Sequence, residues 1–215
     1  MMDELPSKTA VNRYIPKEAF YRHARVGSAV RQLFVDQIDR ITLTNIVDNE
    51  RMNVRPGEWA EIDVLEVRLK EGAHGLAPEA LNILGELANP SIVRELIPGD
   101  EYRRYSISYK VHTYGGHPKT ERMLTSPWTT KHLDFSGVSI DAIYASLITQ
   151  ISGLSADNNS TPAKLSSVDE VIIRHDEAEA AKKQIKRLKK QYSKESSTVK
   201  RNEIARRIHE LKNKL

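Results

Sequence analysis

Cysteine is absent from the 215-residue chain, which excludes disulfide bonds, thiolate metal sites and catalysis by a thiol. Long apolar runs are absent too, and no stretch approaches the roughly 20 residues of a membrane-spanning helix. The N-terminal stretch, MMDELPSKTAVNRY, lacks the apolar centre of a secretory signal. From these absences we expect a soluble, cytoplasmic protein with no membrane partner.

Motifs that announce a catalytic mechanism are also missing. The chain contains neither a glycine-rich phosphate-binding loop nor the nucleophile elbow of serine hydrolases. His112 and His117 flank a predicted Gly115-Gly116 turn, and His132 follows, but these histidines lack the tight spacing of zinc ligands. Solvent-exposed histidines are the simpler interpretation. We therefore predict no cofactor and no metal site.

The formal net charge of +4 is divided unevenly along the chain. Residues 182–215 contain thirteen Lys or Arg and three Glu, a net charge of +10, so residues 1–181 carry −6. Such asymmetry is a recognised indication of contact with nucleic acid or with an acidic partner. The basic character of the chain therefore belongs to its C-terminal tail.

Hydrophobic patterning predicts an α+β fold with a mixed or antiparallel five-stranded sheet and packed helices. The organising strand is expected at residues 61–70, EIDVLEVRLK, where Leu65, Val67 and Leu69 form one continuous apolar face. The other strands are predicted at residues 40–47, 91–97, 103–113 and 121–128.

The segments around these strands are predicted from their turn and capping residues. Residues 1–14 are polar and are expected to be irregular, and residues 48–58 are expected to form a connector. Ser139 is expected to cap a helix over residues 139–152. Further helices are predicted to begin near residues 16, 28 and 78.

The chain is predicted to contain an α+β body over residues 1–153, a linker over 154–167 and a basic antiparallel helical hairpin over 168–215. The linker is rich in Ser, Asn, Thr and Pro, which favour irregular structure. In the tail, apolar residues at three- and four-residue steps predict a narrow seam for a partner helix, formed by Ile185, Leu188, Tyr192, Ile204, Ile208 and Leu211. That partner helix is either in the same hairpin or in another chain.

Acidic residues of the organising strand give it the outline of a restriction-type nuclease motif. Such a site needs an acidic residue on one strand and an acid-x-Lys on the next, which hold a divalent ion and place a cation near the attacking water. Asp48 or Asp63 with Glu66-x-Arg68 is the closest match, although Arg replaces Lys. Alternation puts Glu66 and Arg68 on one side, where a cross-strand charge pair is the ordinary explanation. Asp63, Glu66 and Arg68 are thus candidate catalytic residues, and the favoured interpretation is that the chain has none.

The basic tail is the stronger functional signal. Coiled-coil exteriors usually balance Lys with Glu, whereas here the ratio is lopsided. Exposed cations neutralise phosphates and bind nucleic acid independently of its sequence, while the seam can dock a partner helix at the same time. The predicted nucleic-acid-binding residues are Lys182, Lys183, Lys186, Arg187, Lys189, Lys190, Arg201, Arg206 and Arg207.

Three stretches of the chain together resemble a known family. They are LPSKTAVNRYIPKEAFY, EIDVLEVRLK, and IDAIYASLITQISGL followed by the basic helical tail. The most specific piece is Val11-Asn12, a short gap, then Ile15-Pro16-Lys17 and Ala19-Phe20-Tyr21. Over nearly its whole length the chain resembles the bacterial domain of unknown function 4391 family. The resemblance implies a DNA methyltransferase and a helicase encoded nearby, as in restriction or phage-defence islands, and it supplies no catalytic residues.

These observations lead to one main hypothesis and two alternatives. The main hypothesis is a non-catalytic accessory subunit of a restriction-modification-like or phage-defence complex. It would contact a protein partner, by resemblance a helicase or DNA methyltransferase, and DNA without sequence preference. The alternatives are a degenerate metal-dependent nuclease and a stand-alone nucleic-acid-binding module.

Overall fold

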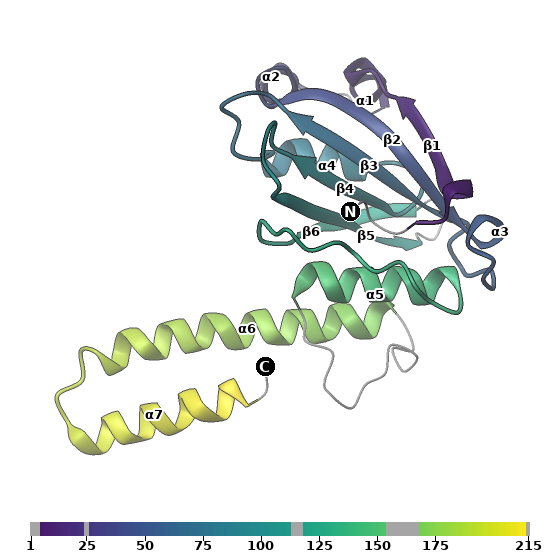
Figure 1. The fold of residues 1–215 in the computed structure, drawn as a ribbon. Helices are drawn as coiled ribbons and strands as arrows, with labels where there is room; N and C mark the ends of the chain where they lie inside the picture. Colours follow the sequence, from purple (N-terminus) through teal and green to yellow (C-terminus); the bar gives the residue numbers. More distant parts are fainter. Residues whose placement is uncertain (1–4, 24–25, 113–117, 154–167, 214–215) are drawn as a thin grey trace. The chain divides into compact units, whose positions relative to one another are not determined.

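A six-stranded mixed sheet is the centre of the fold (Figure 1). The computed structural model describes residues 5–23, 26–112, 118–153 and 168–213. In chain order the elements are a 3-10 turn (Ser7–Thr9), β1 (Ala10–Tyr14), α1 (Lys17–His23), α2 (Ser28–Gln37), β2 (Ile38–Asp48), α3 (Asn49–Met52), β3 (Glu61–Leu69), α4 (Pro78–Gly85), β4 (Ser91–Leu96), β5 (Arg103–His112), β6 (Pro118–Thr125), α5 (Ile140–Ser152), α6 (Val168–Tyr192) and α7 (Thr198–Lys212).

The strands lie side by side in the order in which they occur in the chain, from β1 to β6. Each neighbouring pair is antiparallel except β3 and β4, which are parallel. A parallel pair needs a crossover connection, and α4 forms it between β3 and β4. The predicted α+β class with a mixed sheet is therefore confirmed.

The sheet has one strand more than predicted, because the N-terminal residues are not irregular. The extra strand, β1, pairs antiparallel with β2, with Arg13 opposite Leu43 and Tyr14 opposite Thr42. Four of its five residues are exposed, so its sequence shows no apolar alternation. It is a strand because its backbone groups bond to the edge of β2, and this contact between distant segments leaves no local pattern. The predicted connector likewise contains the short helix α3.

One face of the sheet carries the core that the alternation in β3 predicts. Leu65, Val67 and Leu69 are fully buried there. They belong to one apolar cluster with residues from three helices, namely Phe20 of α1, Phe34 of α2 and Ala80, Leu81 and Leu84 of α4. Burying side chains of this size contributes about 1.5–3 kcal/mol each, so this cluster is a main source of stability. Helices α1, α2 and α4 therefore cover this face.

Helix α5 covers the opposite face (Figure 1). Its predicted N-cap is confirmed, since Ser139 Oγ accepts a hydrogen bond from the Ala142 amide. Tyr144 of α5 is fully buried, and its hydroxyl accepts from the Lys110 amide and donates to the Ser108 carbonyl of β5. A helix attached to a strand by both apolar packing and buried hydrogen bonds is held in one orientation.

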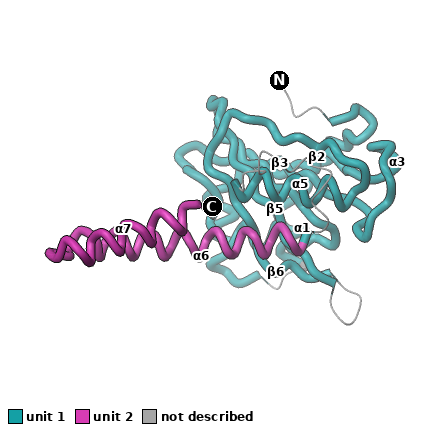
Figure 2. The backbone as a smooth tube through the Cα atoms, turned by 90° about the horizontal axis from the view of Figure 1, so that it is seen from below, with its two compact units in different colours: residues 1–168 teal, residues 169–215 magenta. Residues whose placement is uncertain are grey.

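The chain divides into two units, residues 1–168 and 169–215 (Figure 2). The predicted linker at 154–167 lies outside the described residues. In the second unit α6 and α7 lie against each other as a helix pair within one chain (Figure 1). Across the described helices of both units, none has the length and hydropathy needed to cross a membrane.

Candidate nucleic-acid interface and a buried polar cluster

Asp63 and Glu66 lie on opposite faces of the sheet. Strand β3 pairs with β4 without a register shift, so its side chains alternate regularly. Asp63 therefore shares a face with Leu65, which lies in the cluster under α4. Glu66 is on the other face, where its Oε2 is 2.7 Å from Arg94 Nη2 on the neighbouring strand. The two carboxylates cannot bind one ion, and the charge pair across strands accounts for Glu66.

The remaining parts of the nuclease outline are separated as well. Arg68 is exposed near the end of β3. Asp48 is the last residue of β2 and not part of a connector, and its side chain accepts a hydrogen bond of 2.7 Å from the Arg51 amide at the start of α3. It also forms an ion pair with the Arg51 guanidinium. Asp48 thus acts as a helix cap.

Asp63 belongs instead to a polar cluster near the end of α4. Burial, reinforced by the negative charge of Glu61, raises its pKa to about 6, against an opposing hydrogen bond from Asn89. The Asn89 amide also donates to Glu61 Oε1 at 2.6 Å. This carboxyl group therefore changes its protonation state near neutral pH, unlike an ordinary surface aspartate.

Lys110 of β5 is the cationic member of this cluster and is only 3% exposed. Within the described residues its Nζ makes one hydrogen bond, 2.7 Å to Thr120 Oγ1, which in turn donates to the Gly85 carbonyl at 2.7 Å. Burial lowers the pKa of Lys110 to about 8, opposed by the charges of Glu86 and Asp63. A buried lysine with one neutral hydrogen-bond partner is energetically unfavourable, and groups of this kind concentrate at functional sites.

The buried ion pair between Glu95 and Arg104 differs from Lys110 in that its charges are matched. Glu95 is fully buried, and both its oxygens lie 2.7 Å from nitrogens of Arg104. Its Oε2 also accepts from the Leu76 amide at 2.7 Å. The Arg104 guanidinium lies over the ring of Trp128. This bidentate pair is a structural element, in contrast to Lys110.

The histidines considered as metal ligands are held by other contacts. His112 stacks on Trp59, with ring centroids 4.4 Å apart, and its Nε2 is 3.3 Å from Glu58 Oε1. His132 lies 3.1 Å from a guanidinium nitrogen of Arg103. His117 is outside the described residues. Among the described residues, no three His, Asp or Glu side chains are grouped to hold a metal ion.

The helix pair separates its apolar residues from its basic residues. Ile185 is buried, and the other five seam residues, Leu188, Tyr192, Ile204, Ile208 and Leu211, are half-buried. The nine basic residues identified from the sequence are all exposed. The structure therefore brings the seam together inside one chain and leaves the cations on the outside.

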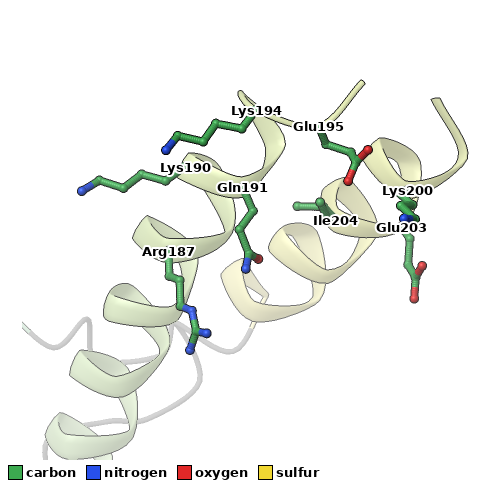
Figure 3. Close-up of a pocket in the computed structure, with 8 residues that line it drawn as sticks. All are labelled: Arg187, Lys190, Gln191, Lys194, Glu195, Lys200, Glu203 and Ile204. Atoms are coloured by element: carbon green, nitrogen blue, oxygen red, sulfur yellow. The ribbon is translucent and has the colours of Figure 1, made fainter. Parts of the chain in front are cut away.

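An open groove of about 670 Å³ runs between the two helices (Figure 3). Its basic lining comes from Arg187, Lys190 and Lys194 on the α6 side and Lys200 of α7, with Glu195 and Glu203 as its acidic members. Glu195 has a structural contact, because its Oε1 accepts from the Ser197 amide at 3.0 Å. Lys194 and Lys200 were not among the predicted residues, although both belong to the same basic run in the sequence.

A model of one protein family matches residues 4–215. The chain belongs to the domain of unknown function 4391 family. The match spans residues of both units. No curated protein and no solved structure matches the chain.

The burial of Lys110 was not predicted from the sequence. In β5 the residues Ser106, Ser108 and Lys110 alternate with Tyr105 and other apolar residues, a pattern typical of a half-exposed strand. The polar positions are nevertheless buried, because α4 covers that face. The sequence shows a lysine among small polar residues of one strand. That pattern indicates a buried lysine only when it is known which face of the strand is covered.

Proposed function

We propose that this member of the domain of unknown function 4391 family is a non-catalytic accessory subunit of a cytoplasmic, DNA-targeting complex. Its helix pair would bind nucleic acid through phosphates, and the chain would also hold a protein partner. The restriction-like or phage-defence setting, with a helicase or DNA methyltransferase as partner, is drawn from the family resemblance.

One observation carries the nucleic-acid part of this proposal. The nine predicted cations are exposed on two helices whose seam residues are buried or half-buried. Lys182 and Arg206 pair with Glu179 and Glu210 of their own helices, and Arg201 lies over the Tyr192 ring, so the other six cations carry most of this argument. Exposed cations on a helical scaffold are suited to neutralising phosphates, which gives binding that is independent of sequence and sensitive to salt. The seam holds the two helices together and so keeps the cations on their outer sides.

The separation of Asp63 from Glu66 argues against catalysis by the candidate nuclease residues. A two-carboxylate metal site needs both oxygen ligands within about 2–2.6 Å of one ion. Residues on opposite faces of an unbroken strand do not meet this requirement, and Glu66 is engaged by Arg94. The stand-alone nucleic-acid-binding module remains the alternative, and it differs from the main proposal in needing no protein partner.

The test combines a salt titration of duplex binding with purification of the tagged chain from its native cell. Lys186→Glu with Lys190→Glu reverses two exposed charges, and Leu188→Asp places a charge in the seam. We expect the charge reversal to weaken duplex binding strongly. Leu188→Asp should separate the two helices and thereby abolish recovery of a helicase or methyltransferase. Plasmid incubated with Mg²⁺ or Mn²⁺ should stay intact.

Each part of the proposal has an outcome that would contradict it. A parent protein that does not bind duplex even at low salt would refute nucleic-acid binding. Plasmid cleavage by the parent that Glu66→Ala abolishes, with folding retained, would refute the non-catalytic role. Duplex binding without any co-purifying protein would favour the stand-alone module.

A further inference from the structure

The charge of the helix pair changes sign within α6. Residues 168–181 contain five acidic residues and one Arg, a net charge of −4, whereas residues 182–213 contain twelve basic and three acidic residues, a net charge of +9. Four of the five acidic side chains in the first segment are exposed. A polyanion is therefore repelled by the first half of α6 and attracted from Lys182 onward.

Four cations form a stripe along one side of α6. Lys183, Arg187 and Lys190 follow helical spacing of four and three residues, and Lys194 follows four residues later, just beyond the helix end. We call these four residues the basic stripe. All four are exposed and, within the described residues, none forms an ion pair. The stripe spans about 16 Å at 1.5 Å per residue, which is the length of about five base-pair steps measured along the axis of a duplex.

The stripe continues across the groove to the first turn of α7. Arg187, Lys190 and Lys194 belong to the α6 side of the groove and Lys200 to its α7 side, and the Lys190 and Lys194 side chains extend away from α7 into open space (Figure 3). Stabilisation of helix dipoles explains cations at the end of α6, since Asp169 and Glu170 lie in its first turn and basic residues in its last. It does not explain Lys200, because this cation lies in the first turn of α7, at the positive end of the helix dipole. Cations at that position favour an external anion.

The helix pair has few aromatic side chains on which unpaired bases could stack. Its described part contains one Phe, Tyr or Trp residue, Tyr192, which is half-buried in the seam. The Arg201 guanidinium lies 4.7 Å from the centre of its ring. Proteins that bind single strands stack bases on exposed aromatic rings, and such rings are missing from this surface. The chemistry therefore favours the backbone of a duplex.

We propose that the basic stripe, together with Lys200 across the groove, follows the phosphate backbone of a nucleic-acid duplex, while the acidic first half of α6 stays outside the contact. This inference rests on the proposed nucleic-acid binding and specifies its ligand and its position. It predicts that charge at the stripe, and not the net charge of the protein, determines affinity.

The test is a salt titration of the full chain with a mixed-sequence DNA duplex of about 20 base pairs and with one of its strands alone. Arg187→Gln with Lys190→Gln removes two stripe cations while keeping long polar side chains. We expect the slope of log affinity against log salt to become flatter by about two units, at about 0.9 per phosphate. The matched control, Lys119→Gln with Lys131→Gln, removes the same charge from exposed residues of the first unit and should leave the slope unchanged.

The outcomes separate this inference from the broader proposal. Absence of duplex binding by the parent at low salt would refute both. If the parent binds duplex and the two variants change the slope equally, net charge governs binding, and the stripe is refuted while nucleic-acid binding stands. Tighter binding of the single strand than of the duplex would refute the duplex assignment. Circular dichroism of the variants establishes that the helices are intact.

Discussion

Asp63→Asn should stabilise the protein at neutral pH and lose that advantage in acid. The raised pKa of about 6 means that the folded state holds the proton of Asp63 more tightly than the unfolded state, whose value is near 3.8. The stability linked to this proton is present below pH 3.8 and is lost as the pH rises through 6. Asparagine removes this dependence while keeping the shape of the side chain.

The size of the effect follows from the pKa difference. About two pKa units correspond to nearly 3 kcal/mol at 1.36 kcal/mol per unit, and partial exposure of Asp63 reduces this to about 2 kcal/mol. The variant should thus be more stable than the parent at pH 7, and its advantage should shrink by about 2 kcal/mol at pH 4. Lys110, whose pKa is about 8, is largely protonated throughout this range in the parent.

Urea unfolding monitored by tryptophan fluorescence measures this difference. Both tryptophans, Trp59 and Trp128, lie in the first unit, so the signal reports the unit that contains Asp63. Glu121→Gln, which changes an exposed carboxylate on β6, is the control and should stay within about 0.5 kcal/mol of the parent. A stability difference between Asp63→Asn and the parent that is constant from pH 4 to 7, or that grows in acid, would refute the reasoning.

The other predictions concern folding stability. Leu65→Ala should cost about 2–5 kcal/mol in urea unfolding, and Glu66→Ala about 1 kcal/mol; equal costs would show that the buried face of β3 is misassigned. Glu95→Gln should cost about 3 kcal/mol, because it leaves Arg104 without its buried partner, and a neutral effect would contradict this. Relative to the parent, the free energy of unfolding of Lys110→Met should rise by about 2 kcal/mol as pH falls from 10 to 7. The reason is that burial lowers the pKa of Lys110 to about 8 in the folded parent, which therefore loses stability as pH falls through 8. A difference that stays constant with pH would show that Lys110 is not desolvated.

Local patterning determined the parts of this protein that local contacts build. The alternation in β3 marks Leu65 and Val67 as interior residues, and Ser139 caps α5 because capping involves only neighbouring amides. The seam from Ile185 to Leu211 and the cations around it follow from helical spacing alone. These features depend on residues within one or two turns, or on one strand.

Tertiary structure alone decided which polar residues are buried and which carboxylates meet. Strand β1 exists because β2 has a free edge, and its own residues carry no strand pattern. Asp63 shares a face with Lys110 because α4 and two intervening strand pairings bring residues far apart in sequence together, whereas Glu66, three residues away, points to the opposite face. Such contacts form between distant segments and leave no periodic trace in the sequence, since desolvation depends on what covers a residue and not on its neighbours in the chain.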